Sequence, residues 1–465
     1  MGFLDENYLL TNDTAKRLFN IIKSLPIVDA HNHSDAHEIA ENENYTDIWQ
    51  AEVATDHYIW ELMRKRGVSE TFITGTATNE EKWMKLAEIF EDLVGNPVYE
   101  WVHLDLRQRL GITELISKTT AQSIWNQAIH ILQQENKRPQ QILKEMSVES
   151  MCTTNDPIDL LADHKKLMDI YGKGYIRPTW RPDNAMNIFR PTWVEYVEKL
   201  GQRVEKYPLT LDDFIEALRT THDYFAEFGC ITSDHGMLIP LGFEVNKEDV
   251  EDIYERRIND EETTEEEHML FMSYMLHEFA QMDVEKGWVM QLHIGAVRDA
   301  RESLLTIIGP DSGGDISNHT VEIVDSLLDL LNSYDEKNPI LDPKYRGLKV
   351  VLYCLDPSHQ PTLATITRAF GKNVNLGAAW WFNDTPIGMK RQLEYISSVD
   401  LLMNYAGMVT DSRKLLSYGS RTEMFRRVLA DVLGSMVEKG QIPEELAIKT
   451  AKHVCYDGPK HFFGF

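Results

Sequence analysis

The sequence predicts an α/β protein whose core is a (β/α)8 TIM-type barrel, with a large helical insertion after the first strand. Short runs rich in Val, Ile and Cys alternate with longer helical stretches, eight such runs occur, and each ends in polar residues. Strands that alternate with helices form right-handed βαβ units, and eight of them close most economically into a barrel. An open doubly wound sheet is the alternative, but no Gly-rich phosphate turn follows the first run.

The runs give the order of the expected strands. The chain divides into an N-terminal helix with the first barrel strand (1–33), a helical insertion (34–146) and the remainder of the barrel (147–465). The insertion has helical patterning such as EKWMKLAEIFEDLVG, and it rises above the active face. The eight strand runs are 27–33, 147–156, 175–183, 230–236, 288–296, 349–356, 374–384 and 405–413.

Composition excludes several classes of protein. The 465 residues are 43% hydrophobic and 26% charged, which is typical of a globular chain, and no stretch is apolar for 18 residues. A net charge of −27 repels nucleic acid and anionic membrane surfaces, so neither is an expected partner. Four scattered cysteines without a CxxC motif indicate a reducing, cytoplasmic location. We expect a small-molecule partner and a symmetric homo-oligomer.

The clearest chemical pattern is an HxH motif at the end of the first run. His31 and His33 share strand parity, so both imidazoles can point to one position beyond the strand end. That arrangement suits a metal ion, although two histidines at this spacing are often only polar neighbours. Asp29 has the same parity and would either orient an imidazole from below or serve as a buried structural carboxylate.

Two further ligand types follow other runs. His293 ends the fifth run and Asp411 ends the eighth, and in a barrel the carboxyl ends of all strands meet at one mouth. Imidazoles with a carboxylate suit Zn²⁺, with Mn²⁺ as the alternative. A hydrogen-bonded core histidine and a helix N-cap are the structural alternatives for His293 and Asp411.

Other polar residues at strand ends could bind substrate. Arg181 and Arg413 end the third and eighth runs, and a guanidinium binds a carboxylate through a bidentate fork. His57 and Tyr58 interrupt an apolar helix pattern in the insertion, where Tyr58 beside an arginine could act as a base and plain helix packing is the alternative. Trp381 could form the wall of a sugar pocket.

The starting motifs of several other enzyme classes are missing. The sequence contains no GxSxG, no GxxxxGK[ST] and no HExxH. Serine-hydrolase, P-loop and zincin chemistry therefore lack their characteristic residues.

Taken together, the motifs resemble the amidohydrolase superfamily, and within it the uronate isomerase (glucuronate isomerase) family. The resemblance covers almost the whole chain. The motifs that carry it, in chain order, are DAHNH, TDHYIWELMRKRGV with ITG after it, GNPVYEWVHLDLR, CTTNDP, RPTWRPD, SDHG, QLHIGA, AWWFND and GMVTDSR.

The resemblance implies a role for each matched residue. His31, His33 and Asp411 would hold the metal, with His293 as a ligand or a hydrogen-bonding neighbour. Arg181 would bind the substrate carboxylate. His57 and Tyr58 would reach in from the insertion, and Arg413 would pair with Tyr58. The chain departs from the wider superfamily in lacking a bridging lysine and a histidine at the sixth strand end, so one metal is expected in place of two.

The implied reaction is the aldose–ketose interconversion of D-glucuronate with D-fructuronate and of D-galacturonate with D-tagaturonate, through a cis-enediol. Ring opening needs a proton moved between O5 and the C1 hydroxyl, and Asp411 is placed for it. For the C2 proton we favour Tyr58 activated by Arg413, with Asp411 as the alternative. A mononuclear metal-dependent hydrolase or deaminase is the alternative enzyme, and a non-catalytic sugar-acid binding protein is the alternative from another class.

Overall fold

The computed structural model describes residues 2–335 and 347–465. Within these ranges the main sheet has seven parallel strands in the order β1-β2-β3-β4-β5-β8-β9. These strands are β1 (Ile27–Asp29), β2 (Val148–Asn155), β3 (Ile176–Trp180), β4 (Thr232–Met237), β5 (Val289–Ile294), β8 (Lys349–Cys354) and β9 (Val374–Leu376). A short antiparallel ribbon, β6 (Ala296–Val297) with β7 (Ile316–Ser317), follows β5.

The sheet curls strongly round its own interior. The Gln291 side chain of β5 donates a hydrogen bond to the carbonyl of Ala30, directly after β1, at 2.9 Å. These strands are four places apart in the sheet, which would separate them by about 19 Å if the sheet were flat. The α/β, TIM-like class expected from the sequence is therefore confirmed, because only a curled sheet lets one side chain span it.

The eighth expected strand forms differently. Residues 405–413 have no regular strand, although Ala406 N–H donates to Leu376 O at 3.1 Å and Asp411 N–H donates to His31 O at 3.2 Å. The segment thus lies between β9 and the end of β1, as an eighth strand would. It cannot continue a ladder because Gly407 and Asp411 have positive φ angles (97° and 48°). In addition, the Thr410 N–H donates a hydrogen bond to Asp29 Oδ1 at 3.1 Å, so it is not available to a neighbouring strand.

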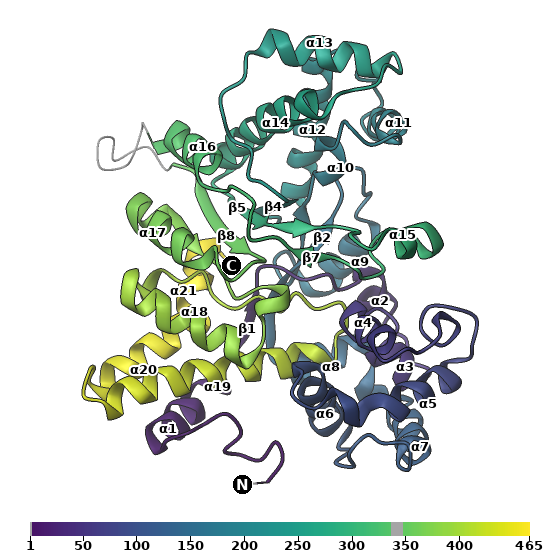
Figure 1. The fold of residues 1–465 in the computed structure, drawn as a ribbon, viewed down its shortest axis with the longest axis vertical. Coiled ribbons are helices and arrows are strands. Elements are labelled where there is room, and N and C mark those ends of the chain that lie inside the picture. The colour runs from purple at the N-terminus through teal and green to yellow at the C-terminus, as the bar shows by residue number, and fades with distance from the viewer. Residues whose placement is uncertain (1, 336–346) are drawn as a thin grey trace.

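Helices cover the outside of the sheet and fill the connections (Figure 1). The N-terminal helix α1 (Asp13–Ile22) packs on the long C-terminal helix α19 (Ser417–Glu438). The barrel connections contain α9 (Ala162–Tyr171), α10 (Asp183–Met186), α11 (Trp193–Arg203), α12 (Leu211–Glu227), α13 (Lys247–Ile258), α14 (Glu265–Lys286), α15 (Glu302–Ile308), α16 (Asp325–Asp335), α17 (Gln360–Phe370) and α18 (Pro386–Val399), and the chain ends with α20 (Glu444–Lys452) and α21 (Gly458–Phe463).

Local sequence signals account for many of these boundaries. Helix α14 begins with a capping box between Thr264 and Glu267 and ends at Gly287, whose φ of 69° suits glycine. Strand β5 is buried along its whole length, as a strand covered on both faces must be. Its two polar residues, Gln291 and His293, share strand parity. Gln291 donates to Ala30 O, and His293 bonds to Asp234 of β4.

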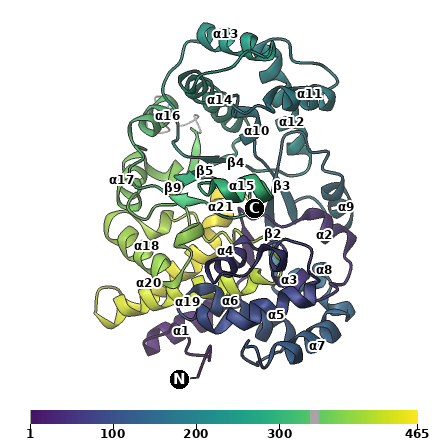
Figure 2. The same ribbon diagram turned by 45° about the vertical axis from the view of Figure 1, so that its right-hand side comes forward.

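The segment between β1 and β2 consists of helices and the loops that join them. It contains α2 (Ala36–Glu41), α3 (Ile48–Glu52), α4 (His57–Lys65), α5 (Asn79–Ile89), α6 (Pro97–Leu110), α7 (Ala121–Leu132) and α8 (Pro139–Glu145). Figures 1 and 2 show α3 to α7 gathered on one side of the molecule beside α19. Helix α6 packs on α19, and Trp101 Nε1 donates to Met424 Sδ at 3.2 Å across this contact.

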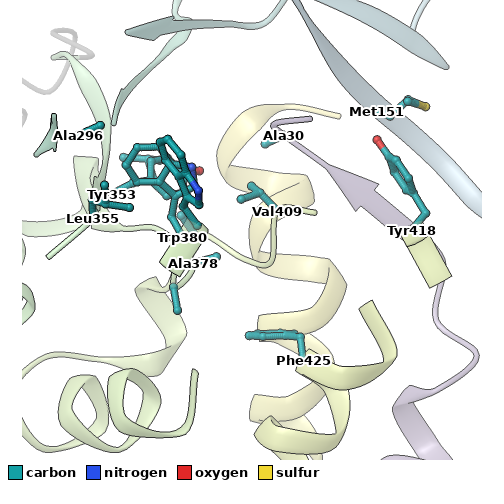
Figure 3. Packing of buried hydrophobic residues seen from close by; sticks show 14 of the residues in the cluster. Ala30, Met151, Ala296, Tyr353, Leu355, Ala378, Trp380, Val409, Tyr418 and Phe425 are labelled. Atoms are coloured by element: carbon teal, nitrogen blue, oxygen red, sulfur yellow. The ribbon is translucent and has the colours of Figure 1, made fainter. Parts of the chain in front are cut away.

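The packed interior continues from the sheet to α19. Figure 3 shows Ala30 and Val409 between the aromatic pair Tyr353 and Trp380 on one side and Tyr418 on the other. Segments distant in the sequence meet here, and all five residues are buried. This packing fixes the backbone on either side of the polar groups described next.

Candidate metal centre and active site

Three side chains converge at the carboxyl end of β1. The Nε2 atoms of His31 and His33 lie 3.3 Å and 3.4 Å from the same oxygen, Oδ1 of Asp411. His31 is fully buried, while His33 and Asp411 are partly open to solvent. The HxH motif and the eighth run therefore meet as the sequence predicted, and their donor atoms point to one place.

Paired backbone contacts hold these residues together. Asp411 N–H donates to His31 O, and His33 N–H donates to Ser412 O at 2.9 Å. Asp29 binds the segment from below through both the N–H and the hydroxyl of Thr410, the latter at 2.6 Å. Of the two roles considered for Asp29, the structure shows the structural one. The left-handed backbone at Asp411 is unusual outside glycine and indicates that the surroundings impose its conformation.

Asp234 joins the centre from β4, and the sequence analysis did not select it. Its Oδ1 lies 2.7 Å from Nδ1 of His293 and its Oδ2 lies 3.3 Å from Nδ1 of His31. One buried carboxylate thus contacts two imidazoles. Asp234 lies in the motif SDHG and has the same strand parity as Gly236, the residue that pairs with His293 in β5. This shared parity was the signal that could have identified it.

His293 lies in the centre but outside the group formed with Asp411. It bonds to Asp234 and stacks on Tyr353 with ring centroids 4.3 Å apart. Among the described residues, its Nε2 has no hydrogen-bond partner. Burial lowers the pKa of His293 to about 4, so the ring is neutral near pH 7.

The three converging residues fit a divalent metal. Two imidazole nitrogens and a carboxylate oxygen are the donors that zinc and manganese take in proteins. Nε2 of His31 points to the place where the three donors converge, and its Nδ1 faces Asp234, which is the usual arrangement for orienting a histidine ligand. His31, His33 and Asp411 therefore meet the requirements of donor type and convergence.

Arg181 lies at the same end of the sheet, already bound by acids. Its Nε donates to Asp183 at 2.7 Å and its Nη1 donates to Asp234 at 3.1 Å. The planar guanidinium holds Asp234 in place and remains partly exposed. A substrate carboxylate would therefore compete with two protein carboxylates for this arginine.

Tyr58 has a different partner from the one expected. Its hydroxyl donates to Asp384 Oδ2 at 3.2 Å, and Arg421 of α19 bonds that same oxygen at 2.8 Å while lying over the Tyr58 ring. The expected pairing of Arg413 with Tyr58 is thus corrected, because Arg421 occupies that place. Burial and the neighbouring Asp384 raise the pKa of Tyr58 well above its usual value.

Arg413 instead lies near His33 and His57 at the mouth. After burial, its charge is the largest factor that lowers the pKa of His57, to about 4. His57 is therefore neutral, and it contacts the Trp381 ring at 5.5 Å between centroids. Trp381 is buried and has a φ of 52°, which is rare for a bulky residue and points to an imposed position.

Comparisons with known proteins agree with this geometry. A family model described as glucuronate isomerase matches residues 1–463. The curated uronate isomerase of Thermotoga sp. (strain RQ2) is 52% identical over 461 residues, covering 99% of each chain. The chain belongs to the uronate isomerase family.

Solved structures of this family have the same fold. A crystal structure of uronate isomerase from Thermotoga maritima is similar with a TM-score of 0.95 and 52% identity, covering all of both chains. A glucuronate isomerase from Caulobacter crescentus has a TM-score of 0.92 at 26% identity, covering 99% of this chain and 97% of its own. As a uronate isomerase the protein is an enzyme of the isomerase class. None of the described helices combines the length and apolarity of a membrane span.

Proposed function

We propose that the enzyme interconverts D-glucuronate with D-fructuronate and D-galacturonate with D-tagaturonate, with one divalent metal bound by His31, His33 and Asp411. The observation that carries the proposal is the convergence of two Nε2 atoms on one carboxylate oxygen at the mouth of a uronate isomerase barrel. We favour zinc, with manganese as the alternative. When bound, the metal would polarise substrate oxygens and stabilise negative charge on the enediolate.

The side chains supply the proton transfers. Burial opposes the charge on Asp411, but hydrogen bonds from His31 and His33 hold its pKa well below the usual value, so the group is an ionised carboxylate. We propose that Asp411 moves the proton between O5 and the C1 hydroxyl during ring opening. Because Tyr58 keeps its proton in these surroundings, we favour Asp411 over Tyr58 as the group that takes the C2 proton and returns it to C1 of the cis-enediol. On substrate binding the Tyr58 O–H would turn from Asp384 and donate a hydrogen bond to the developing enediol.

The remaining residues would bind and orient the substrate. Arg181 is proposed to bind the carboxylate, assisted by the charge of Arg413, since Arg181 alone is neutralised by Asp183 and Asp234. Neutral His57 would donate to or accept from sugar hydroxyls, and Trp381 would cover a sugar face. We further propose a homo-oligomer in a cytoplasmic location, supported by four free cysteines.

The decisive experiment is turnover of glucuronate and galacturonate by the purified protein, followed by proton NMR and combined with metal analysis. Ketose formation with about one divalent metal per chain is expected, and solvent deuterium should enter C1 if the enediol route is partly open to water. Hydrolysis or deamination without ketose formation would favour the metal-dependent hydrolase, and tight binding without turnover would favour a sugar-acid binding protein.

A further inference from the structure

A buried lysine joins the helical insertion to the segment that carries Asp411. The Lys414 ammonium bonds Glu52 Oε1 at 2.6 Å and the Glu52 carbonyl at 2.9 Å, and it lies 3.1 Å from Asp56 Oδ2. All three side chains are buried. A fully buried ammonium is stable only when carboxylates and carbonyls replace its hydration, as they do here.

Both acids come from the insertion, at the place where α3 ends and α4 begins. Glu52 is the last residue of α3, and Asp56 is the N-cap of α4, whose side chain accepts from Tyr58 N–H at 3.0 Å. His57 and Tyr58 are the first two residues of that helix. Whatever fixes Asp56 therefore fixes the two side chains that the insertion brings to the site.

The other end of the contact is the metal segment. Lys414 follows Asp411 by three residues, and its carbonyl accepts from Ser412 Oγ at 2.7 Å. A second bond, from Thr55 Oγ1 to Arg413 O at 2.9 Å, joins the same two segments. The positions of α4 and of residues 410–414 are thus coupled through one short set of contacts.

The charges of the cluster make this contact strong. Asp105 of α6 lies beside Glu52, and together with Asp56 three acids surround one lysine. Burial and the neighbouring Asp105 raise the pKa of Glu52 well above its usual value, while the charge of Lys414 is the largest factor that lowers the pKa of Asp56. Removing the lysine would leave buried negative charge that must move toward water.

We propose that Lys414 is a positioning residue, which clamps the start of α4 against residues 410–414 and so sets His57 and Tyr58 relative to Asp411. This inference depends on the proposed roles of those three residues. A clamp of this kind would act mainly on turnover, because a displacement of about 1 Å in a catalytic group can cost about 10²-fold in rate.

The test compares Lys414→Met with a matched control variant, Lys82→Met. The control also removes a buried lysine, but one that lies in α5 of the insertion. For Lys414→Met we expect the wild-type metal content, a kcat for glucuronate lowered about 10- to 100-fold, and a smaller change in KM. Lys82→Met should keep kcat. A Lys414→Met protein with wild-type kcat, or one whose kcat falls only in proportion to lost metal, would overturn the proposal.

A double-mutant cycle separates the clamp from general destabilisation. Asp56→Asn removes the charge but keeps an N-cap acceptor, so α4 still begins at the same place. If Lys414 acts through Asp56, the double variant should have nearly the kcat of the Lys414→Met single variant, whereas independent effects would multiply and contradict the clamp. If Lys414→Met does not fold, Asp56→Asn alone should lower kcat and Lys414→Arg should keep most of it.

Hydrogen exchange gives a readout that does not depend on turnover. Amides of residues 57–60 should exchange faster in Lys414→Met than in wild type or Lys82→Met, measured without substrate. Unchanged protection there would argue against the clamp even if activity fell. Absence of uronate turnover in the wild type, with faster exchange in the variant, would remove the proposed function and leave the clamp as a structural device.

Discussion

At the residue scale, the most informative group is Tyr58 with Asp384 and Arg421. The Tyr58 hydroxyl and the Arg421 guanidinium share one oxygen of Asp384, and all three are largely buried. A phenol held by a carboxylate keeps its proton more firmly than one held by an arginine alone. Tyr58 is therefore better suited to donating a hydrogen bond than to acting as a free phenolate base.

We predict that Tyr58→Phe retains the metal and substrate binding but loses about 10²- to 10³-fold in kcat, the usual contribution of one hydrogen-bond donor to a developing negative charge. The reason is that only the ionisable oxygen is removed, while the ring still packs on Trp101. Steady-state kinetics of glucuronate isomerisation with metal analysis would measure this. Full activity in the variant would show that the Tyr58 hydroxyl does not stabilise the enediol.

Arg181, directly after β3, can be compared with a second arginine inside that strand. Arg181→Met should lose about 30-fold to several thousand-fold in kcat/KM for glucuronate, since truncating one partner of a buried charged pair costs roughly 2–5 kcal/mol. Arg177→Met is the control, because Arg177 lies in β3, four residues before Arg181, but binds the carbonyls of Gly174 and Gly229. Glucose, which has no carboxylate, should be a very poor substrate for both variants. Normal glucuronate turnover by Arg181→Met would exclude Arg181 as the carboxylate site.

At the scale of elements, helix α6 connects the insertion to α19 and contains a buried histidine with fixed hydrogen bonds. His103 Nδ1 bonds the Tyr99 carbonyl at 2.7 Å, and its Nε2 accepts from Ile116 N–H at 2.9 Å. These partners require the neutral ring with the proton on Nδ1. A second proton on Nε2 would break the bond to Ile116.

The pH dependence of stability follows from this arrangement. Burial lowers the pKa of His103 to about 4, below the unfolded value near 6.5, so the unfolded chain binds more protons between these pH values. The free energy of unfolding should therefore decrease as the pH falls from 6.5 to 4, with about 3 kcal/mol from His103. Urea unfolding of wild type and His103→Gln across this range would measure the difference.

The exposed His130 of α7 provides the control for that series. His130→Gln changes a surface position and removes no buried hydrogen bond, so it should follow the wild-type curve. An identical pH dependence for His103→Gln and wild type would show that His103 is not responsible for the loss at low pH.

At the scale of the whole molecule, the metal should stabilise the fold. The three proposed ligands come from the end of β1 and from a segment nearly 380 residues further on, so a bound metal would link the two ends of the barrel. Added metal raises stability by RT ln(1 + [L]/Kd), about 2.7 kcal/mol at 100 times Kd.

We predict about one divalent metal per chain and a Tm that rises with zinc or manganese. Chelation should lower the Tm, and the double variant His31→Ala with His33→Ala should bind little metal and show no such rise. Calorimetry with elemental analysis would check both. Two metals per chain, or undiminished binding in the double variant, would contradict a single site.

The sequence by itself determined the α/β class, the helical character of the segment between the first two strands and most of the side chains that meet at the mouth. Period-two patterning decides which side chains of a strand share a face, and the carboxyl ends of parallel strands lie at one mouth. His31, His33, His293 and Asp411 could therefore be assigned to one place from spacing alone. The helical insertion was predictable for the same kind of reason, since helix periodicity is a local property.

Only the tertiary structure decided which charged groups pair across the molecule. Asp234, Asp384 and Arg421 are partners of site residues 50 to more than 300 positions away, and no local period encodes such a choice. The irregular eighth segment was likewise decided by Asp29, whose carboxylate takes a backbone N–H that a strand would give to its neighbour. Each of these outcomes depends on desolvation and hydrogen bonding between distant segments, which exist only once the chain has folded.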